Sequence, residues 1–303
     1  TILRPPSKRD LTPVRELALI PFPSQELFSA DISKFSLIIL DQYTLQGILP
    51  KKYLDNIVDY VINGGAILNI SGQEYLGDRS LTNSPLANIL PAKPESFSTK
   101  PFIPTLTNLG KRHPITNTLE KSYKNKKWGK WFSFIKTNQT SGQTLMTANS
   151  HPLLIINEVS DGRIAQILSD QGWVWKKDRK NKGPLLKLLR NIIYWLLKTP
   201  EFQENYLEVF KNGDLVTLNL NSLYQGNTKA IITSPMGKEI SVLMKDNKNG
   251  SLIGTFESNE YGKFSLNVHD IKKDFFLGVS NSIELERVLS SDFLIESFFK
   301  KNK

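Results

Sequence analysis

The feature that most constrains the fold is a strand–helix–strand pattern near the beginning of the chain. Residues 36–41 form an apolar run that ends in an acid, and residues 50–63 have helical spacing. Gly64-Gly65 ends that helix, residues 66–70 form a second apolar run, and the run breaks at Ser71. This order predicts a parallel βαβ unit. Because such sheets bind ligands beyond the carboxyl ends of their strands, the stretch that begins at Ser71 is the first candidate site.

The sequence pattern changes about two thirds of the way along the chain. The first part begins with a predicted strand at residues 16–21 and closes with an amphipathic helix over residues 183–198. Short alternating runs separated by turn residues follow, with no helical period between them. We predict an α/β domain over residues 1–203, an antiparallel β-sandwich of immunoglobulin-like size over residues 204–290, and a short tail over residues 291–303.

Composition excludes several classes of site. The 303 residues include no cysteine, which excludes disulfides, cysteine nucleophiles and thiolate metal sites. The three histidines lack the spacing of a metal motif, so we expect no metal and no cofactor. The net charge of +10 favours anionic lipid, polyanions or acidic proteins as partners, although such an excess is first of all a solubility property. No apolar run approaches the roughly 18 residues of a membrane span, and the chain reads as a piece of a longer protein.

Several motifs of the first two hundred residues together resemble a class I glutamine amidotransferase-like domain. They occur in order along the chain, at residues 37–43, 53–61, 64–65, 71–74, 84–91, 112–116, 128–132 and 162–170, and at Trp173 and Trp175. More narrowly, the segment is similar to such a domain in large bacterial membrane proteins, where it precedes a sandwich domain. The resemblance implies a flavodoxin-like, mostly parallel sheet with helices on both faces. It also implies the soluble part of a membrane-anchored cell-envelope protein, with the periplasmic side favoured.

The resemblance also identifies where the catalytic residues of a working amidotransferase would be. In such enzymes the strand equivalent to residues 66–70 ends in a cysteine, and a late strand supplies a histidine and a glutamate. Here the nucleophile position falls on Ser71, and the late strand ends in Ser169, Asp170 and Gln171. Without the thiolate and the base, glutaminase activity is not expected.

A serine hydrolase is an alternative that uses the same strand end. Ser71 would be the nucleophile and His113 or His151 the base, with Asp41, Glu74 or Asp170 orienting it. The elbow pattern Gly-x-Ser-x-Gly is absent around Ser71, which favours a serine that caps a turn. The catalytic candidates of this alternative are Ser71, His113 and Asp170.

Polar and aromatic residues at the predicted strand ends form a candidate ligand site. A few convergent polar groups beside apolar walls are typical of binding pockets, although a vestigial site that only packs is an equally open reading. The members of this site are Asp41, Gln42, Tyr43, Ser71, Gln73, Glu74, Asp170 and Trp173.

The segment Lys121–Lys136 mixes lysines with aromatic residues, a combination that can bind polyanions or single-stranded nucleic acid. Packing of these aromatics onto the sheet explains the same pattern, so nucleic acid is not the expected partner. An anionic membrane surface or another envelope protein is favoured over it. The leading functional hypothesis is therefore a non-catalytic binding or scaffolding module.

Overall fold

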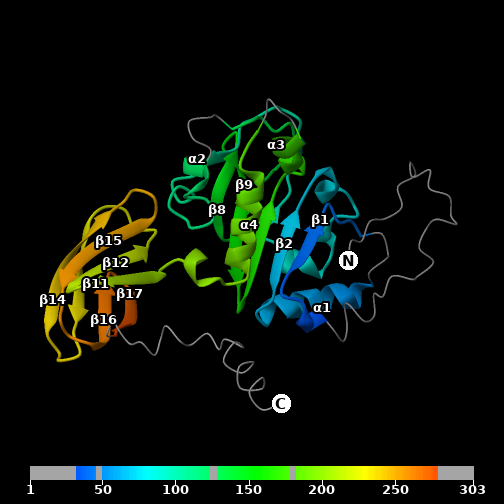
Figure 1. The fold of residues 1–303 in the computed structure, drawn as a ribbon. Helices are drawn as coiled ribbons and strands as arrows, with labels where there is room; N and C mark the ends of the chain where they lie inside the picture. Colours follow the sequence, from blue (N-terminus) through cyan, green and yellow to red (C-terminus); the bar gives the residue numbers. More distant parts are fainter. Residues whose placement is uncertain (1–31, 46–49, 123–127, 178–181, 279–303) are drawn as a thin grey trace, which may run out of the picture. The chain divides into compact units, whose positions relative to one another are not determined.

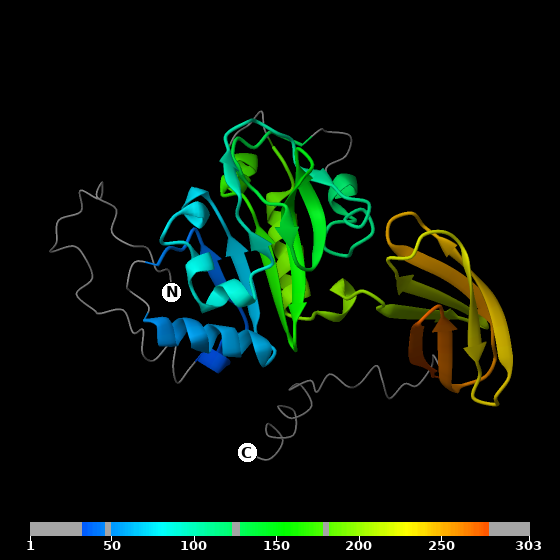
Figure 2. The same cartoon turned by 180° about the vertical axis from the view of Figure 1, so that it is seen from behind.

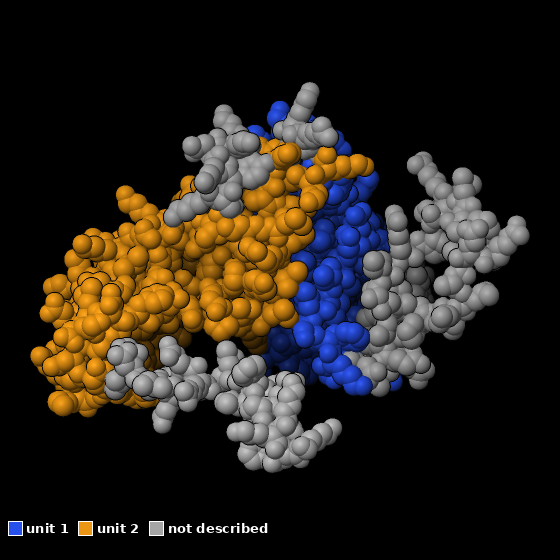
Figure 3. Space-filling view, in the orientation of Figure 1, with its two compact units in different colours: residues 1–104, 130–174 blue, residues 105–129, 175–303 orange. Residues whose placement is uncertain are grey.

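In the structure, a computed structural model, the chain forms two compact units (Figure 3). Unit 1 consists of residues 1–104 and 130–174, and unit 2 of residues 105–129 and 175–303. Within these units the structure describes residues 32–45, 50–122, 128–177 and 182–278. The strand predicted at residues 16–21 and the tail at residues 291–303 lie outside the described residues. Among the helices that the structure describes, none is long and apolar enough to cross a membrane.

The sheet of unit 1 is mixed rather than mostly parallel (Figure 1). Its strands lie in the order β1 (Ile38–Asp41), β2 (Ala66–Ile70), β10 (Gly162–Ile167), β9 (His151–Val159) and β8 (Gln143–Ala148). Strand β2 is parallel to β1 and to β10, whereas β9 is antiparallel to both β10 and β8.

The predicted flavodoxin-like fold with a mostly parallel sheet and helices on both faces is therefore wrong. Strands make up 39% of the described residues and helices 22%. The physical reason is the connections: β8, β9 and β10 follow one another through tight turns, which can join only antiparallel strands. The first turn is at Asn149 and Ser150, both with positive φ.

Helix α1 (Lys51–Ile62) supports the parallel part of this sheet. Its apolar stripe, which includes Leu54, Ile57 and Val61, belongs to the same buried cluster as Ile67 of β2 and Ile164 of β10. The predicted βαβ unit is confirmed in both its strands and its helix. Short elements complete unit 1 (Figure 2): η3 (Ile32–Lys34), η4 (Gln73–Leu76), η5 (Leu81–Asn83), η6 (Pro85–Asn88), η7 (Gln171–Trp173), and the strand pairs β3 (Ala92–Lys93) with β7 (Gln139–Thr140) and β4 (Ser96–Ser98) with β6 (Phe134–Lys136).

Unit 2 contains a single antiparallel sheet of seven strands. Their order is β11 (Leu207–Asn212), β12 (Leu215–Asn221), β15 (Ser251–Glu257), β14 (Glu239–Asp246), β13 (Thr228–Thr233), β16 (Gly262–Val268) and β17 (Ile271–Leu277). Alternate side chains of these strands form one buried core. Other elements of the unit are β5 (Thr105–Leu106), α2 (Leu119–Ser122), α4 (Leu185–Leu196) and η8 (Pro200–Phe202), while α3 (Val174–Lys177) begins at the last residue of unit 1.

The predicted two-sheet β-sandwich is also wrong, because this sheet curls into a nearly closed barrel-like form. Strand β14 is the cause. Its first six residues pair with β13, and its last two residues, Lys245 and Asp246, pair with β15. One strand thereby links the two groups of strands that a sandwich would keep in separate sheets.

Arg112 ties the segment 105–129 to the barrel within unit 2. Its side chain is 4% exposed, and its Nη1 contacts the carboxylate of Asp246 at 2.9 and 3.0 Å. Nη2 donates to the backbone carbonyls of Ser222, at 3.1 Å, and Tyr224. A buried guanidinium with this many partners fixes the start of unit 2 on the end of β14.

Candidate functional site

Ser71 stands directly after β2, at the position where the sequence predicts chemistry. Its N–H donates to the carbonyl of Ile167 at 2.9 Å, which extends the pairing between β2 and β10 by one step. Its side chain is 1% exposed. The Ser71 Oγ accepts hydrogen bonds from Asn69 Nδ2 at 3.0 Å and from Gln166 Nε2 at 3.2 Å. The hydroxyl is thus enclosed by two amide donors and has no open path to a substrate.

These two amide residues were missed by the sequence analysis. Asn69 and Gln166 are direct partners in the parallel register of β2 and β10, and both are buried. The available signal was a polar residue between apolar neighbours in each strand, Asn69 in β2 and Gln166 in β10. Buried amides need partners, so their presence predicts a third polar group between them. Ser71 is that group.

The same network continues away from the strand end. Gln166 Oε1 accepts the N–H of Ala92 at 3.2 Å, which fixes the orientation of the amide, and Tyr75 Oη donates to the carbonyl of Ala92 at 2.7 Å. Burial raises the pKa of Tyr75 to about 12, against a smaller lowering by the hydrogen bond from Gln166. The network therefore joins β2, β10, η4 and β3, and its role is to hold these elements together.

Three carboxylates lie outside this buried network, at the carboxyl ends of the neighbouring strands β1, β2 and β10. They belong to Asp41, Glu74 and Asp170. The Oε1 of Glu74 accepts the N–H of Gly72 at 2.6 Å. Burial raises the pKa of Glu74; the hydrogen bond from Gly72 opposes the shift, and the negative charges of Asp170 and Asp41 add to it. The edge of the sheet is thus a region of negative potential.

Gly72 lies close to the acidic side chains at this edge, and an added Cβ would displace the end of the Glu74 side chain. A Cβ atom there would lie 2.7 Å from Glu74 Oε2 and 3.4 Å from Asp170 Cβ. The absence of a Cβ therefore lets the side chains of Glu74 and Asp170 lie close to the backbone of Gly72.

The remaining predicted ligand residues lie around the carboxylates with different exposure. Gln42 has a φ of 48° and donates its N–H to the Ile70 carbonyl at 2.8 Å, which turns the chain away after β1. Tyr43 is half-buried, and burial raises its pKa. Gln73 is exposed at the start of η4, and the side chain of Trp173 is 54% exposed in η7. The aromatic ring of Trp173 is the largest exposed apolar surface among these residues.

The two histidines proposed as bases belong to different units. His113 belongs to unit 2, where its Nδ1 accepts the N–H of Ile115 at 3.2 Å and its Nε2 contacts Glu204 Oε1 at 2.6 Å. Both ring nitrogens are therefore engaged inside unit 2, and the Nε2–H tautomer leaves no lone pair for a serine proton. His151 is the first residue of β9, and its ring lies 5.9 Å from that of Phe134.

Most of the described aromatic rings in the segment Lys121–Lys136 are buried. Trp128, Trp131 and Phe134 are 9%, 1% and 1% exposed, and Phe132 is 42% exposed. Trp131 packs edge-on against Phe102, with ring centroids 6.1 Å apart. Stacking on nucleic acid bases needs accessible ring faces, which these buried side chains do not offer. Residues 123–127 of the segment lie outside the described residues.

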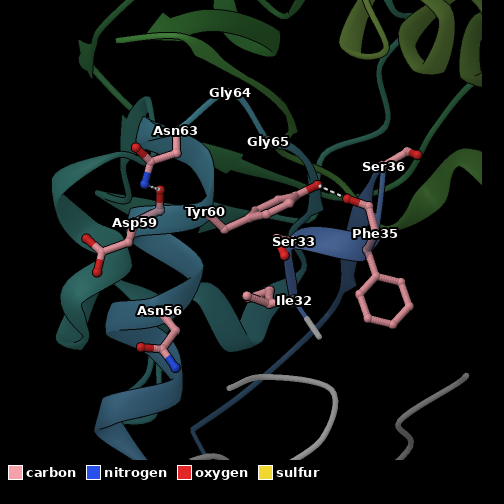
Figure 4. Close-up of a pocket in the computed structure, with 10 residues that line it drawn as sticks. All are labelled: Ile32, Ser33, Phe35, Ser36, Asn56, Asp59, Tyr60, Asn63, Gly64 and Gly65. Carbon is pink, nitrogen blue, oxygen red and sulfur yellow. Dashed lines mark hydrogen bonds between the residues drawn. The ribbon is translucent and has the colours of Figure 1, made fainter. Parts of the chain in front are cut away.

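A cavity of about 430 Å³ lies at the other end of β2, between η3 and the end of α1 (Figure 4). The hydroxyl of Tyr60 donates to the Phe35 carbonyl at 3.0 Å and accepts the N–H of Ala66 at 3.2 Å. A Cβ at Gly65 would lie 2.4 Å from the Tyr60 ring, so this glycine makes room for the ring. The cavity lining is Ile32, Ser33, Phe35, Ser36, Asn56, Asp59, Tyr60, Asn63, Gly64 and Gly65. No motif in the sequence indicates a cavity at this edge.

No group of three or more His, Asp or Glu side chains that could hold a metal ion occurs within the described residues. The arrangement at the carboxyl edge can attract positive charge and offer hydrogen-bond acceptors. It holds no activated nucleophile.

Comparisons with known proteins give only solved structures of low similarity. No family model matches the chain, and no curated protein matches it. Two solved cytoplasmic proteins of Salmonella typhimurium are each 20% identical, with TM-scores of 0.45 and 0.44, and each comparison covers 58% of this chain and 76% of the other. A β-galactosidase from Bacillus circulans sp. alkalophilus is 14% identical with a TM-score of 0.35, over 75% of this chain and 34% of the enzyme. Scores this low support no conclusion about function, and the amidotransferase-like resemblance stays a prediction.

Proposed function

We propose that this chain is a non-catalytic binding module whose ligand lies at the carboxyl edge of β1, β2 and β10. The observation that carries the proposal is the state of Ser71. Its Oγ is buried and already accepts two amide hydrogen bonds, from Asn69 and Gln166. A serine nucleophile needs access to a carbonyl carbon and a base that takes its proton. The buried hydroxyl of Ser71 has no such access. His113 is not available as the base, because both of its ring nitrogens are engaged elsewhere.

The chemistry of the edge favours a cationic group as the ligand. Burial is the main cause of the raised pKa of Glu74, and the negative charges of Asp170 and Asp41 are near enough to add to it. An ammonium or guanidinium group placed among them would relieve this repulsion. The exposed ring of Trp173, three residues after Asp170, offers a face on which the same cation can stack. The ligand class is therefore an amine, a guanidine, or a lysine or arginine side chain of a partner protein.

A titration of the full chain with arginine amide and with putrescine tests the binding role. We expect heat of binding in wild type and weaker binding in Asp170→Asn and in Trp173→Ala. Asp78→Asn, which changes an exposed carboxylate outside the cluster, is the matched control and should bind as wild type does. Absence of binding by wild type, or equal weakening in the control, would refute the cationic ligand.

A separate measurement tests the non-catalytic part. A fluorophosphonate probe, which labels activated serines, should leave the protein unmodified. Labelling that Ser71→Ala abolishes would restore the hydrolase alternative. Within the described residues no observation favours that alternative, and none favours polyanion binding by Lys121–Lys136.

We also propose that the module is the soluble part of a membrane-anchored envelope protein and that its first part is a degenerate amidotransferase-like domain. The support is the order of motifs described above and the serine at the nucleophile position. Fractionation of cells that express the parent protein, with an antibody to this region, tests the location. Recovery in the cytosolic fraction would refute it.

A further inference from the structure

Three exposed aliphatic side chains lie on neighbouring strands of the barrel in unit 2. They are Ile231 of β13, Leu243 of β14 and Ile253 of β15, which are 46%, 52% and 37% exposed. Each occupies an outward-facing position, since successive side chains of a strand point to opposite faces of the sheet. The neighbours Ile232, Val242 and Leu252 are buried in the barrel core.

The strand register makes these side chains neighbours. Ile231 pairs with Ser241, two residues before Leu243, and Ile253 pairs with Lys245, two residues after Leu243. Diagonal neighbours of this kind on one face of a sheet are roughly 7–8 Å apart, within reach of long side chains. The three aliphatic residues therefore form a continuous diagonal row.

Lysines flank the row on the same face. Lys229 pairs directly with Leu243, and Lys245 pairs directly with Ile253. Neither lysine forms a salt bridge with another described residue. The outward carboxylates of β14 and β15, Glu239 and Glu257, are each several positions away at the ends of their strands. We call the five residues Lys229, Ile231, Leu243, Lys245 and Ile253 the lysine–aliphatic band.

We infer that the lysine–aliphatic band is a docking surface for an anionic phospholipid membrane. Lysine ammonium groups bind lipid phosphates, and their stems lie along apolar surface while aliphatic side chains enter the interfacial region. The composition argues for lipid over protein. Protein interfaces are enriched in aromatic residues, methionine and arginine and depleted in lysine, whereas this band holds only lysine and aliphatic residues. The chain's net charge of +10 adds a long-range attraction of the same sign.

The two contributions predict separate responses. Each lysine near an anionic leaflet contributes about 1 kcal/mol, so removing one weakens vesicle binding roughly fivefold and removing both roughly thirtyfold. This part falls as salt rises. Replacing Leu243 by serine weakens binding roughly tenfold through lost apolar contact, with little change in salt dependence.

Co-sedimentation of the full chain with vesicles at low salt tests the inference. Wild type should bind vesicles of phosphatidylcholine mixed with phosphatidylglycerol and should not bind pure phosphatidylcholine. Lys229→Gln/Lys245→Gln and Leu243→Ser should both bind less. Lys111→Gln and Leu215→Ser change exposed residues outside the band and are the matched controls.

Three outcomes would overturn the inference. The first is no binding to anionic vesicles by a folded wild type. The second is equal weakening in the controls, which would indicate a general charge effect. The third is binding of an acidic peptide, but not of vesicles, that depends on the band, which would make it a protein-docking surface. Circular dichroism of each variant verifies that it is folded before binding is measured.

Discussion

The replacement Ser71→Ala separates a structural serine from a catalytic one. Removing the hydroxyl leaves Asn69 Nδ2 and Gln166 Nε2 without the acceptor that each now has, in a site where the serine is 1% exposed. A buried donor that loses its partner costs about 1–3 kcal/mol. The relief from no longer burying a hydroxyl offsets part of this cost. We therefore expect the free energy of unfolding of unit 1 to fall by about 2–3 kcal/mol.

The assay is hydrogen exchange of the β2 and β10 amides across a series of urea concentrations, because the two units need not unfold together. Thr99→Ala, which also removes one hydroxyl from unit 1, is the control. Its side chain is exposed, and a surface replacement of this kind changes stability by less than about 0.5 kcal/mol.

A double-mutant cycle tests the cause of the loss. In Asn69→Leu/Ser71→Ala one of the two stranded donors is removed together with its acceptor, so the combined loss should be smaller than the sum of the single losses by about 1 kcal/mol. Strict additivity would show that the hydrogen bond to Ser71 carries no coupling. If Ser71→Ala is as stable as wild type, the argument that Ser71 serves the buried network fails.

Three other predictions follow from the described contacts. Burial raises the folded-state pKa of Glu74 above its ordinary 4.5. The stability that the protonated Glu74 contributes to unit 1 is therefore fully present below pH 4.5 and is lost as pH rises through the folded pKa. Glu74→Gln should flatten this part of the pH–stability profile of unit 1, and an unchanged slope would contradict the raised pKa of Glu74. Arg112→Ala should destabilise unit 2 by about 3 kcal/mol because it leaves the Asp246 carboxylate without its guanidinium partner, whereas Arg190→Ala, at an exposed position, should have little effect. Burial raises the pKa of Asp246, but hydrogen bonds from Gly226 and Arg112 outweigh burial and hold this pKa below 3.8. The difference in stability between Arg112→Ala and wild type should therefore shrink as pH falls through the folded pKa of Asp246. Gly65→Ala should lower the stability of unit 1 by about 1–3 kcal/mol because its Cβ would lie 2.4 Å from the Tyr60 ring, and thermal unfolding at the wild-type temperature would contradict this contact.

Local pattern predicted the elements of this protein better than their arrangement. The expected strand at residues 66–70 and the expected helix at residues 50–63 agree with β2 and α1, because apolar periodicity and the Gly64-Gly65 stop act over a few residues. Strand direction depends instead on how far the chain travels between strands. The tight turns at Asn149 and Asp161 make β8, β9 and β10 antiparallel neighbours, which a resemblance to parallel folds could not show.

The barrel illustrates the same limit in unit 2. Its strands were expected from alternation and turn residues, but alternation says only which side chains face inward. Whether seven strands form one sheet or two depends on β14, whose last two residues pair with β15 after the first six have paired with β13. No local signal in Lys245 or Asp246 encodes that change of partner. The ion pair between Asp246 and Arg112 fixes the same strand end from outside the sheet.

Topology predicted which candidate residues would come together, but not the role of Ser71 among them. Because β1, β2 and β10 are parallel, their carboxyl ends meet, and Asp41, Glu74 and Asp170 come together as the sequence implied. The position after β2 invites a reading as a nucleophile. Yet Asn69 and Gln166 lie beside each other in the sheet, and two buried amides need an acceptor between them more than the edge needs a hydroxyl. The polar residues inside the strands therefore determine the role of Ser71, and the proposed ligand role falls on the carboxylates outside the buried network.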